Sequence, residues 1–180
     1  MRNARVSVLA FTLVELLVTI AIIAVLAALL MPVLGRSKES GRATFCQGNL
    51  HQVGLALQLY VDDNQNIMPY MEDYTNGPAS NQPTINLVLA PQLGSTNVLC
   101  CPSDNQQLFQ ISGSSYSWNY LVNTQKAEQL HIMNLPPTST RIPLVFDKTS
   151  FHANLGTNHA VNYLYADGHI KNLLIISGTQ

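Results

Sequence analysis

The chain has 180 residues, of which 47% are apolar and only 11% charged, and its 9 basic and 10 acidic side chains leave a formal net charge of −1. This length accommodates one modest domain. Because charged residues make up about 25% of an average soluble chain, the composition excludes a charge-rich soluble protein. It also provides no reserve of Lys and Arg to neutralise phosphates, so we expect no nucleic-acid partner.

An apolar stretch of 24 residues, from Phe11 to Leu34, contains a single charge, Glu15. As a helix it would be about 36 Å long, enough to cross a hydrocarbon core of about 30 Å. The only charges of residues 1–10 are two arginines, and the positive-inside rule keeps such a leader in the cytoplasm. A cleaved signal peptide would have an apolar core of only about 7–15 residues. An uncleaved signal anchor fits the length but leaves Glu15 unexplained.

A carboxylate at the membrane centre costs about 2.5–3.5 kcal/mol, so Glu15 is expected to have a function and a positively charged partner. The residues around it resemble the processing site of type IV prepilins and type II secretion pseudopilins: Ala10-Phe11-Thr12-Leu13-Val14-Glu15-Leu16. The resemblance implies that a membrane prepilin peptidase cleaves between Ala10 and Phe11 and methylates the new amine of Phe11. It also implies that Glu15 pairs with the N-terminal ammonium of a neighbouring subunit in a filament.

Two further residues bear on this resemblance. Pro32 stands where the family commonly carries a proline that bends the helix, and neighbouring membrane helices can compensate for the hydrogen bond that a proline removes. The family usually has a glycine before the cleaved bond, where this chain has Ala10. This departure bears on how efficiently the bond is cleaved more than on the resemblance itself.

The helix is expected to continue beyond the membrane. Charged residues mark its exit into water: Arg36, Lys38, Glu39 and Arg42. Apolar or small residues then recur at intervals of three and four: Ala43, Cys46, Leu50, Val53, Leu57 and Tyr60. This periodicity predicts one helix over residues 11–62, which the turn-forming residues 62–66 would end. The apolar stripe should pack on the chain's own sheet, and a surface between subunits is the alternative.

The sequence of this region is also similar to a pilin-like bacterial family that combines a prepilin-type N-terminal segment with a C-terminal His-x9-Asp-Gly motif. The similar segments are Arg36-Ser37-Lys38-Glu39-Ser40-Gly41-Arg42, Cys46-Gln47-Gly48-Asn49-Leu50 and Val53-Gly54-Leu55-Ala56-Leu57. In this chain His159 precedes Asp167-Gly168 by seven residues instead of nine, so the C-terminal motif is a variant.

The remaining residues indicate a small sheet. Residues 64–84 hold Pro69, Gly77, Pro78 and Pro83 among Asn, Ser and Gln residues, which predicts a long surface loop. The strongest strand signal is a predicted hairpin over residues 160–176 with Asp167-Gly168 as a two-residue type I′ turn. Other short apolar runs occupy residues 87–90, 98–101, 115–120 and 142–146. We expect three to five mainly antiparallel strands packed on the helix, which is a pilin-like α+β lollipop.

A metal site has little support in the sequence. The weak candidates are Asp147, His159 and Asp167, with His169 beside the last of these. Calcium is the ion to consider, because the resemblance to secretion pseudopilins implies it near the C-terminus. Calcium takes six to eight oxygen ligands, however, and Asp147 and Asp167 are the only carboxylates in the last 50 residues. A turn aspartate with polar hairpin residues is the favoured reading, and we expect no cofactor.

The three cysteines are disulfide candidates, because thiols are oxidised outside the inner membrane. The pilin-like resemblance extends to Cys46 and to the element Cys101-Pro102-Ser103-Asp104. On that basis Cys46–Cys101 is the preferred bridge, and Cys100 is the odd thiol. A zinc site that includes His131 or His152 is an alternative, but no paired Cys-x-x-Cys spacing supports it.

No pattern for a catalytic nucleophile, a zinc protease or a phosphate loop is present, so we do not expect an enzyme. We expect a pseudopilin or minor pilin with residues 11–34 in the inner membrane and residues 35–180 in the periplasm. Its partners would be the prepilin peptidase and methyltransferase, other pilin subunits and the inner-membrane assembly platform. The alternative is a membrane-anchored binding module that uses the prepilin head only for export, with its long loop and C-terminal hairpin as the recognition surface.

Overall fold

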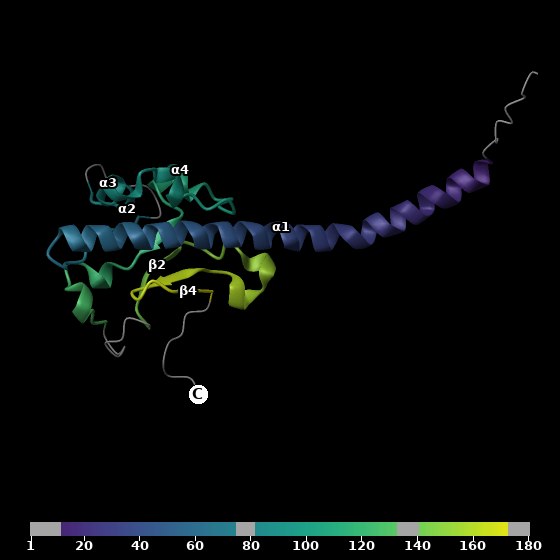
Figure 1. Cartoon of the computed structure of the whole chain (residues 1–180). Helices are drawn as coiled ribbons and strands as arrows, with labels where there is room; N and C mark the ends of the chain where they lie inside the picture. Colours follow the sequence, from purple (N-terminus) through teal and green to yellow (C-terminus); the bar gives the residue numbers. More distant parts are fainter. Residues whose placement is uncertain (1–11, 75–81, 133–140, 173–180) are drawn as a thin grey trace, which may run out of the picture. The chain divides into compact units, whose positions relative to one another are not determined.

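A computed structural model describes residues 12–74, 82–132 and 141–172. Its main element is helix α1, Leu13–Asp63, which runs for 51 residues (Figure 1). The predicted helix over residues 11–62 is confirmed over its described part and ends one residue later than expected. The chain divides into two compact units, and the boundary lies within α1 after Ser37.

The part of α1 that belongs to the second unit presents the predicted stripe to the core. Five of its six members are buried, at 0–5% exposure: Ala43, Cys46, Leu50, Val53 and Leu57. Tyr60 is partly buried against the same core. The stripe therefore packs on the chain's own domain, which confirms the first of the two expectations for it. Burying apolar side chains in this way stabilises a fold by about 25 cal/mol per Å².

The helix packs on a four-stranded antiparallel sheet, as expected. The strand order is β1-β2-β3-β4, and the strands are Tyr116–Trp118, Pro143–Asp147, Tyr163–Tyr165 and Ile170–Lys171. Pairing is antiparallel throughout, with Ser117 opposite Phe146 in β1–β2 and Phe146 opposite Tyr163 in β2–β3. Gly54 lets the helix approach β3 closely, because a Cβ at this position would lie 3.3 Å from the side chain of Leu164.

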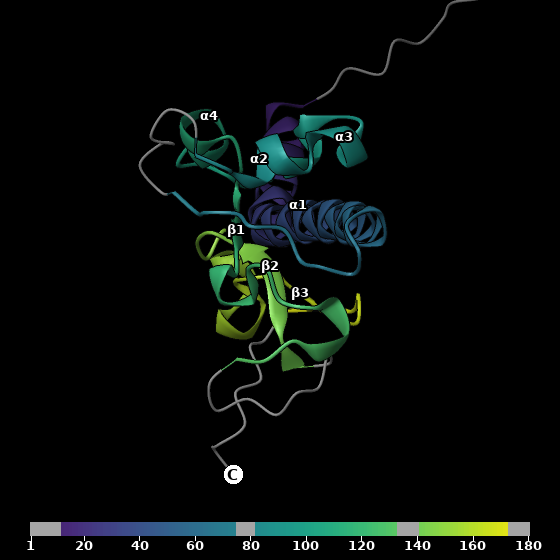
Figure 2. The same ribbon diagram turned by 90° about the vertical axis from the view of Figure 1, so that its left-hand side faces the viewer.

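Short helices cover the opposite side of α1 (Figures 1 and 2). These are α2, Ile85–Val88, α3, Ala90–Leu93, and α4, Leu108–Ser112, with a 3-10 turn η1 at Thr96–Leu99. Further 3-10 turns are η2, Tyr120–Val122, η3, Ala127–Gln129, η5, Ala153–Leu155, and η6, Thr157–His159. The apolar runs over residues 87–90 and 98–101 thus lie mostly in helical turns and not in strands, and their buried members, Leu89 and Leu99, pack on the core.

The hairpin predicted over residues 160–176 is confirmed by strands β3 and β4, and its residues 173–176 lie outside the described residues. The predicted two-residue turn is wrong. Strands β3 and β4 pair with Leu164 opposite Ile170, and Tyr165 N–H donates to the carbonyl of His169 at 2.9 Å. Three residues, 166–168, therefore connect the strands. A type I′ turn needs positive φ at both central residues, whereas of these three only Gly168 has one, at +86°. This pattern is typical of a three-residue loop that ends in a left-handed glycine.

Candidate functional site

The first half of α1 carries a continuous uncovered apolar surface. Every residue from Thr12 to Lys38 is exposed, and the large apolar side chains between Leu13 and Leu34 are 49–78% exposed. The helix is long and apolar enough to cross a membrane. An apolar surface of this extent marks contact with lipid or with other proteins.

Glu15 lies at the start of this surface and is held by its own helix. Its Oε2 accepts hydrogen bonds from Thr12 N–H at 2.9 Å and from Thr12 Oγ1 at 2.7 Å. In return, Thr12 Oγ1 lies 3.2 Å from the N–H of Glu15, which donates to it. This reciprocal arrangement is a capping box, in which two otherwise unpaired backbone donors at a helix start are satisfied. Among the described residues Glu15 forms no ion pair.

Sequence reasoning gave Thr12 no role, although a signal for one was present. A Ser or Thr followed three residues later by Glu, just before an apolar run, is the pattern that predicts a capping box. Thr12 and Glu15 have this spacing. The other two members of the predicted processing site, Ala10 and Phe11, lie outside the described residues.

Pro32 lies inside α1, and the helix continues through it. Proline has no N–H, so the carbonyl of Ala28 lacks its usual partner four residues further along the chain. A neighbouring helix or side chain can compensate for such a loss within a membrane or an assembly.

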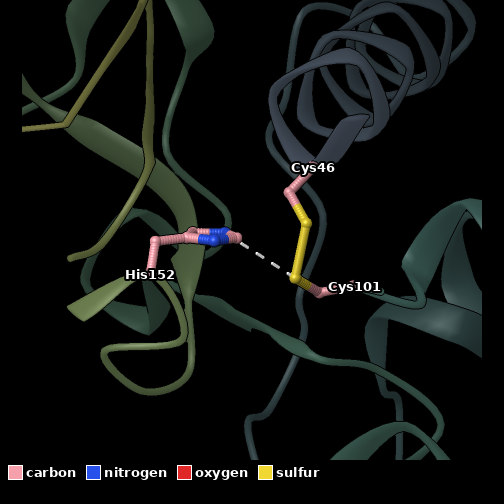
Figure 3. A group of neighbouring side chains, drawn as sticks. All are labelled: Cys46, Cys101 and His152. Carbon is pink, nitrogen blue, oxygen red and sulfur yellow. Dashed lines mark hydrogen bonds between the residues drawn. A yellow bond between two sulfur atoms is a disulfide. The ribbon is translucent and has the colours of Figure 1, made fainter. Parts of the chain in front are cut away.

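A disulfide joins Cys46 on α1 to Cys101, 55 residues later, with a Cα–Cα distance of 5.5 Å. This is the pair that the resemblance implied, and Cys100 is the free, partly exposed thiol. Both bridged cysteines are buried, and the imidazole Nε2 of His152 lies 3.8 Å from Cys101 Sγ (Figure 3). The bridge fastens α1 to the segment that precedes β1.

The residues that follow Cys101 reinforce this attachment. Ser103 Oγ donates to Glu39 Oε1 on α1 at 2.6 Å. Asp104 accepts hydrogen bonds from two backbone N–H groups at the start of α4, at 3.1 and 2.9 Å, and from Ser115 Oγ at 2.8 Å. The Cys-Pro-Ser-Asp element thus has a structural explanation here, because three of its four side chains bind neighbouring segments.

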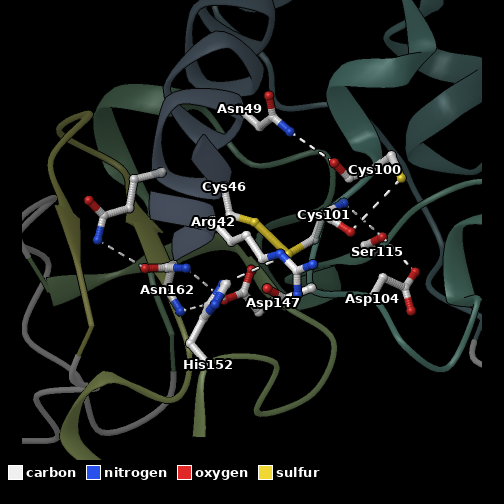
Figure 4. The surroundings of a disulfide bond; sticks show 12 residues. Arg42, Cys46, Asn49, Cys100, Cys101, Asp104, Ser115, Asp147, His152 and Asn162 are labelled. Carbon is white, nitrogen blue, oxygen red and sulfur yellow. Dashed lines mark hydrogen bonds and ion pairs between the residues drawn. A yellow bond between two sulfur atoms is a disulfide. The ribbon is translucent and has the colours of Figure 1, made fainter. Parts of the chain in front are cut away.

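A buried network of ionisable side chains lies beside the disulfide. His152 is completely buried, its Nδ1 lies 2.7 Å from Glu39 Oε1, and its Nε2 lies 3.7 Å from Asp147 Oδ2. Glu39 and Asp147 are 7% and 2% exposed. Glu39 comes from α1 and Asp147 from the end of β2, whereas His152 lies in the turn after β2; Figure 4 shows Asp147 and His152 beside the disulfide. The network therefore joins the helix to the sheet, and Glu39, which we expected at the water-exposed exit of the helix, is instead buried.

The two carboxyl groups of this network are shifted in opposite directions. Burial raises the pKa of Asp147 to about 6, although hydrogen bonds from Asn162 and the nearby charge of His152 oppose that rise. Burial also disfavours the charged form of Glu39, but hydrogen bonds from Ser103 and His152 outweigh it and lower the Glu39 pKa. The two carboxylates thus sit in different environments although they face the same imidazole.

Asn162 completes the network. Its N–H and Nδ2 donate to Asp147 Oδ2 at 2.7 and 2.8 Å. Its Oδ1 accepts from Gln47 on α1 at 3.1 Å and from Asn172 at 2.6 Å. A second polar link between the helix and the C-terminal hairpin region follows from these contacts. Sequence reasoning missed Glu39 and Asn162, because nothing local marks either residue as buried.

The three weak candidates for metal ligands do not lie together in the structure. Asp147 is buried beside His152, His159 is exposed at the end of η6, and Asp167 bonds to His169 in the hairpin turn. Within the described part of the chain, one cluster of potential ligands occurs, formed by Cys46, Cys101 and His152. Its two sulfurs are bonded to each other, so they are not thiolates and do not fit a zinc site. Among the described residues, no group of three possible ligands includes Asp147, His159 or Asp167, whereas calcium takes six to eight oxygen ligands.

No family model, curated protein or solved structure matches the chain. The architecture, a long N-terminal apolar helix that packs on a small antiparallel sheet, is consistent with a pilin-like fold.

Proposed function

We propose that this protein is a structural subunit, a pseudopilin or minor pilin, of a type II secretion pseudopilus or a type IV pilus-like filament. A prepilin peptidase would cleave it between Ala10 and Phe11 and methylate the amine of Phe11. Before assembly, residues 11–34 would anchor it in the inner membrane of a bacterium with residues 35–180 in the periplasm. Its role would be mechanical and not catalytic.

The observation that carries this proposal is the uncovered apolar half of α1 with one carboxylate at its start. Lipid covers such a surface in a membrane, and the helices of neighbouring subunits would cover it in a filament. Glu15 is the exception to the apolar pattern, and a buried carboxylate is tolerated when a positive charge offsets its desolvation. The methylated Phe11 ammonium of a neighbouring subunit would supply that charge.

The capping box gives this pairing a defined starting state. Before assembly, the Glu15 carboxylate is satisfied by Thr12 N–H and Thr12 Oγ1. In the filament it would exchange part of these contacts for the neighbour's ammonium. The partners of the chain would be the prepilin peptidase and methyltransferase, other pilin subunits and the inner-membrane assembly platform. We propose no nucleic-acid partner.

Processing is tested by the mass and N-terminal sequence of the chain recovered from its native membrane, with and without the prepilin peptidase. A chain that starts at methylated Phe11, and that keeps Met1 when the peptidase is absent, supports the proposal. A start at Met1 in both cells would indicate a signal anchor, and a start within residues 25–36 would indicate a cleaved signal peptide. Either result would reject the prepilin pathway.

Assembly is tested separately with Glu15→Gln. Glutamine keeps the capping box, which accepts Glu or Gln at this position, but removes the charge that an ammonium requires. We expect the variant to reach the membrane and to be lost from sheared, sedimented filaments. Glu128→Gln, which changes an exposed carboxylate on η3, is the matched control and should assemble normally. A Glu15→Gln chain that assembles as well as this control would refute the charge pairing and favour the membrane-anchored binding module.

A further inference from the structure

A solvent-open cavity lies where α1 ends and the chain turns into the following loop. Its volume is about 420 Å³, within the range of about 300–1,000 Å³ that small-ligand sites occupy. Tyr60 and Tyr70 contribute aromatic rings, and Ile67 and Met68 contribute apolar side chains. Four polar residues complete the wall: Asp63, Asn64, Gln65 and Thr124. All of these belong to the second compact unit of the chain.

The chemistry of the lining selects a class of ligand. None of the described residues that line the cavity is basic, so nothing there would compensate a phosphate or a carboxylate. Asn64 Nδ2 already donates to the Tyr60 carbonyl, and Thr124 Oγ1 to the Asn123 carbonyl, both at 2.7 Å. The Asp63 carboxylate and the side-chain amides can still bond to a ligand, because an amide oxygen accepts and an amide nitrogen carries two donors. Aromatic rings offer apolar faces for C–H groups. A ligand with many uncharged hydroxyls on an otherwise apolar ring matches this combination.

The aromatic wall is held in place. Tyr60 is partly buried against the core. Tyr70 is 51% exposed, and its hydroxyl donates to Glu72 Oε1 at 2.7 Å. The hydroxyl of Tyr70 is therefore already used, and its ring is the part that remains for contact with a ligand.

The backbone around the cavity is strained and braced. Gln65 and Thr124 have φ values of +56° and +58°, a left-handed conformation that glycine adopts at the lowest cost and that is unusual for a β-branched residue. At Gln65 this conformation ends α1, because Asn66 N–H donates to the Val61 carbonyl at 3.0 Å as in a Schellman motif. Thr124 has no such helix end to explain it, and strained residues of this kind concentrate at functional sites. The two cavity-lining segments are joined by the hydrogen bond from Met68 N–H to the Gln125 carbonyl, at 2.8 Å, and by the antiparallel bridge between Ile67 and Lys126. The cavity is thus formed before any ligand arrives.

We propose that this cavity binds a neutral oligosaccharide, with a sugar ring stacked on Tyr70 and its hydroxyls bonded to Asp63 and the neighbouring amides. The protein would then carry a carbohydrate-recognition site at the C-terminal end of α1. This inference goes beyond the filament role and does not depend on it, because both a filament subunit and an anchored module could present such a site.

The test uses the full chain in a detergent without a sugar head group, since glycosidic detergents would compete for the site. A glycan array with neutral and acidic oligosaccharides identifies the probe, and the neutral glycan with the highest signal is then titrated. We expect binding to neutral glycans in preference to acidic ones. No binding to any neutral glycan, or a preference for acidic ones, would overturn the proposal.

Variants locate the binding. Tyr70→Ala should weaken the titrated affinity about tenfold, the upper range for an aromatic contact, whereas Tyr70→Phe keeps the ring and should bind within about twofold of the native chain. Tyr120→Ala is the matched control, because Tyr120 is 65% exposed and does not line the cavity. Equal binding by Tyr70→Ala and the native chain, or an equal loss in Tyr120→Ala, would reject this site. Fluorescence of the single tryptophan, Trp118, verifies that each variant is folded.

Discussion

Asp147 offers a quantitative test of the buried network, because its titration is linked to stability. Burial raises its pKa to about 6 from the ordinary value of 3.8. The folded state therefore binds the proton more tightly than the unfolded state between these two values. It follows that the free energy of unfolding falls as the pH rises through this interval. With about 1.4 kcal/mol for each pKa unit, the loss between pH 4.5 and pH 7.5 is about 2 kcal/mol.

The substitution Asp147→Asn removes this titration and keeps an oxygen that can accept from Asn162. Glu39 has a lowered pKa, so its contribution has the opposite sign and is lost as the pH falls. It is present in both proteins, and subtracting one stability curve from the other removes most of it. Trp118 is the only tryptophan and is 2% exposed in β1. Its fluorescence during urea unfolding therefore reports on the globular unit of the full chain in detergent.

The expected result is a difference curve with a defined slope. The native chain should lose about 2 kcal/mol more than Asp147→Asn between pH 4.5 and pH 7.5. A difference that stays flat within about 0.5 kcal/mol would show that the Asp147 carboxyl titrates as in water. A slope of opposite sign would show that its charged form is stabilised in the fold. Either outcome would refute the reasoning from burial.

Two further predictions concern α1 and its attachment. Replacing both Cys46 and Cys101 by Ser should lower the free energy of unfolding, measured in urea, by about 4 kcal/mol on the chain-entropy account of a 55-residue loop. The control Cys100→Ser should change it by less than about 0.5 kcal/mol. Similar losses in the two variants would contradict the bridge. Gly48→Ala should stabilise the chain by about 0.5–1 kcal/mol, because a Cβ there meets nothing within 4 Å. Gly54→Ala should raise the free energy of unfolding by less than Gly48→Ala, or lower it, because its Cβ would lie 3.3 Å from the side chain of Leu164 on β3. An equal rise at both positions would show that Leu164 can move aside without an energetic cost.

Three kinds of contact attach the second half of α1 to the rest of the globular unit, which is the second compact unit of the chain, residues 38–180. The apolar stripe supplies the burial, the Cys46–Cys101 bridge restrains the unfolded chain, and the Glu39 carboxylate adds a hydrogen bond with His152. In the proposed filament, a force applied to the apolar half of α1 would be passed to the globular unit through these contacts. The same arrangement would serve an anchored module, so it does not separate the two functions, whereas the Glu15→Gln experiment does.

The hairpin illustrates where local signals suffice and where they fail. Alternation and the Asp167-Gly168 pair located the two strands, because both depend on the conformational preferences of adjacent residues. The length of the connection depends on which residues of β3 and β4 face each other. The observed pairing of Leu164 with Ile170 places one more residue in the turn than the dipeptide signal implied.

The sequence by itself determined the features that depend on neighbours along the chain. The apolar length of residues 11–34 is read directly along the chain, and the three-and-four spacing of the stripe and the Thr12-to-Glu15 spacing follow from the geometry of one helix. Only the tertiary structure decided which distant residues meet. Glu39 and His152 are 113 positions apart, and in sequence Glu39 belongs to a run of ordinary surface charges. The cavity at the end of α1 likewise needs residues 60–70 and residue 124 together. Such contacts form because burying the apolar stripe brings these segments to the same helix, and no local pattern records that outcome.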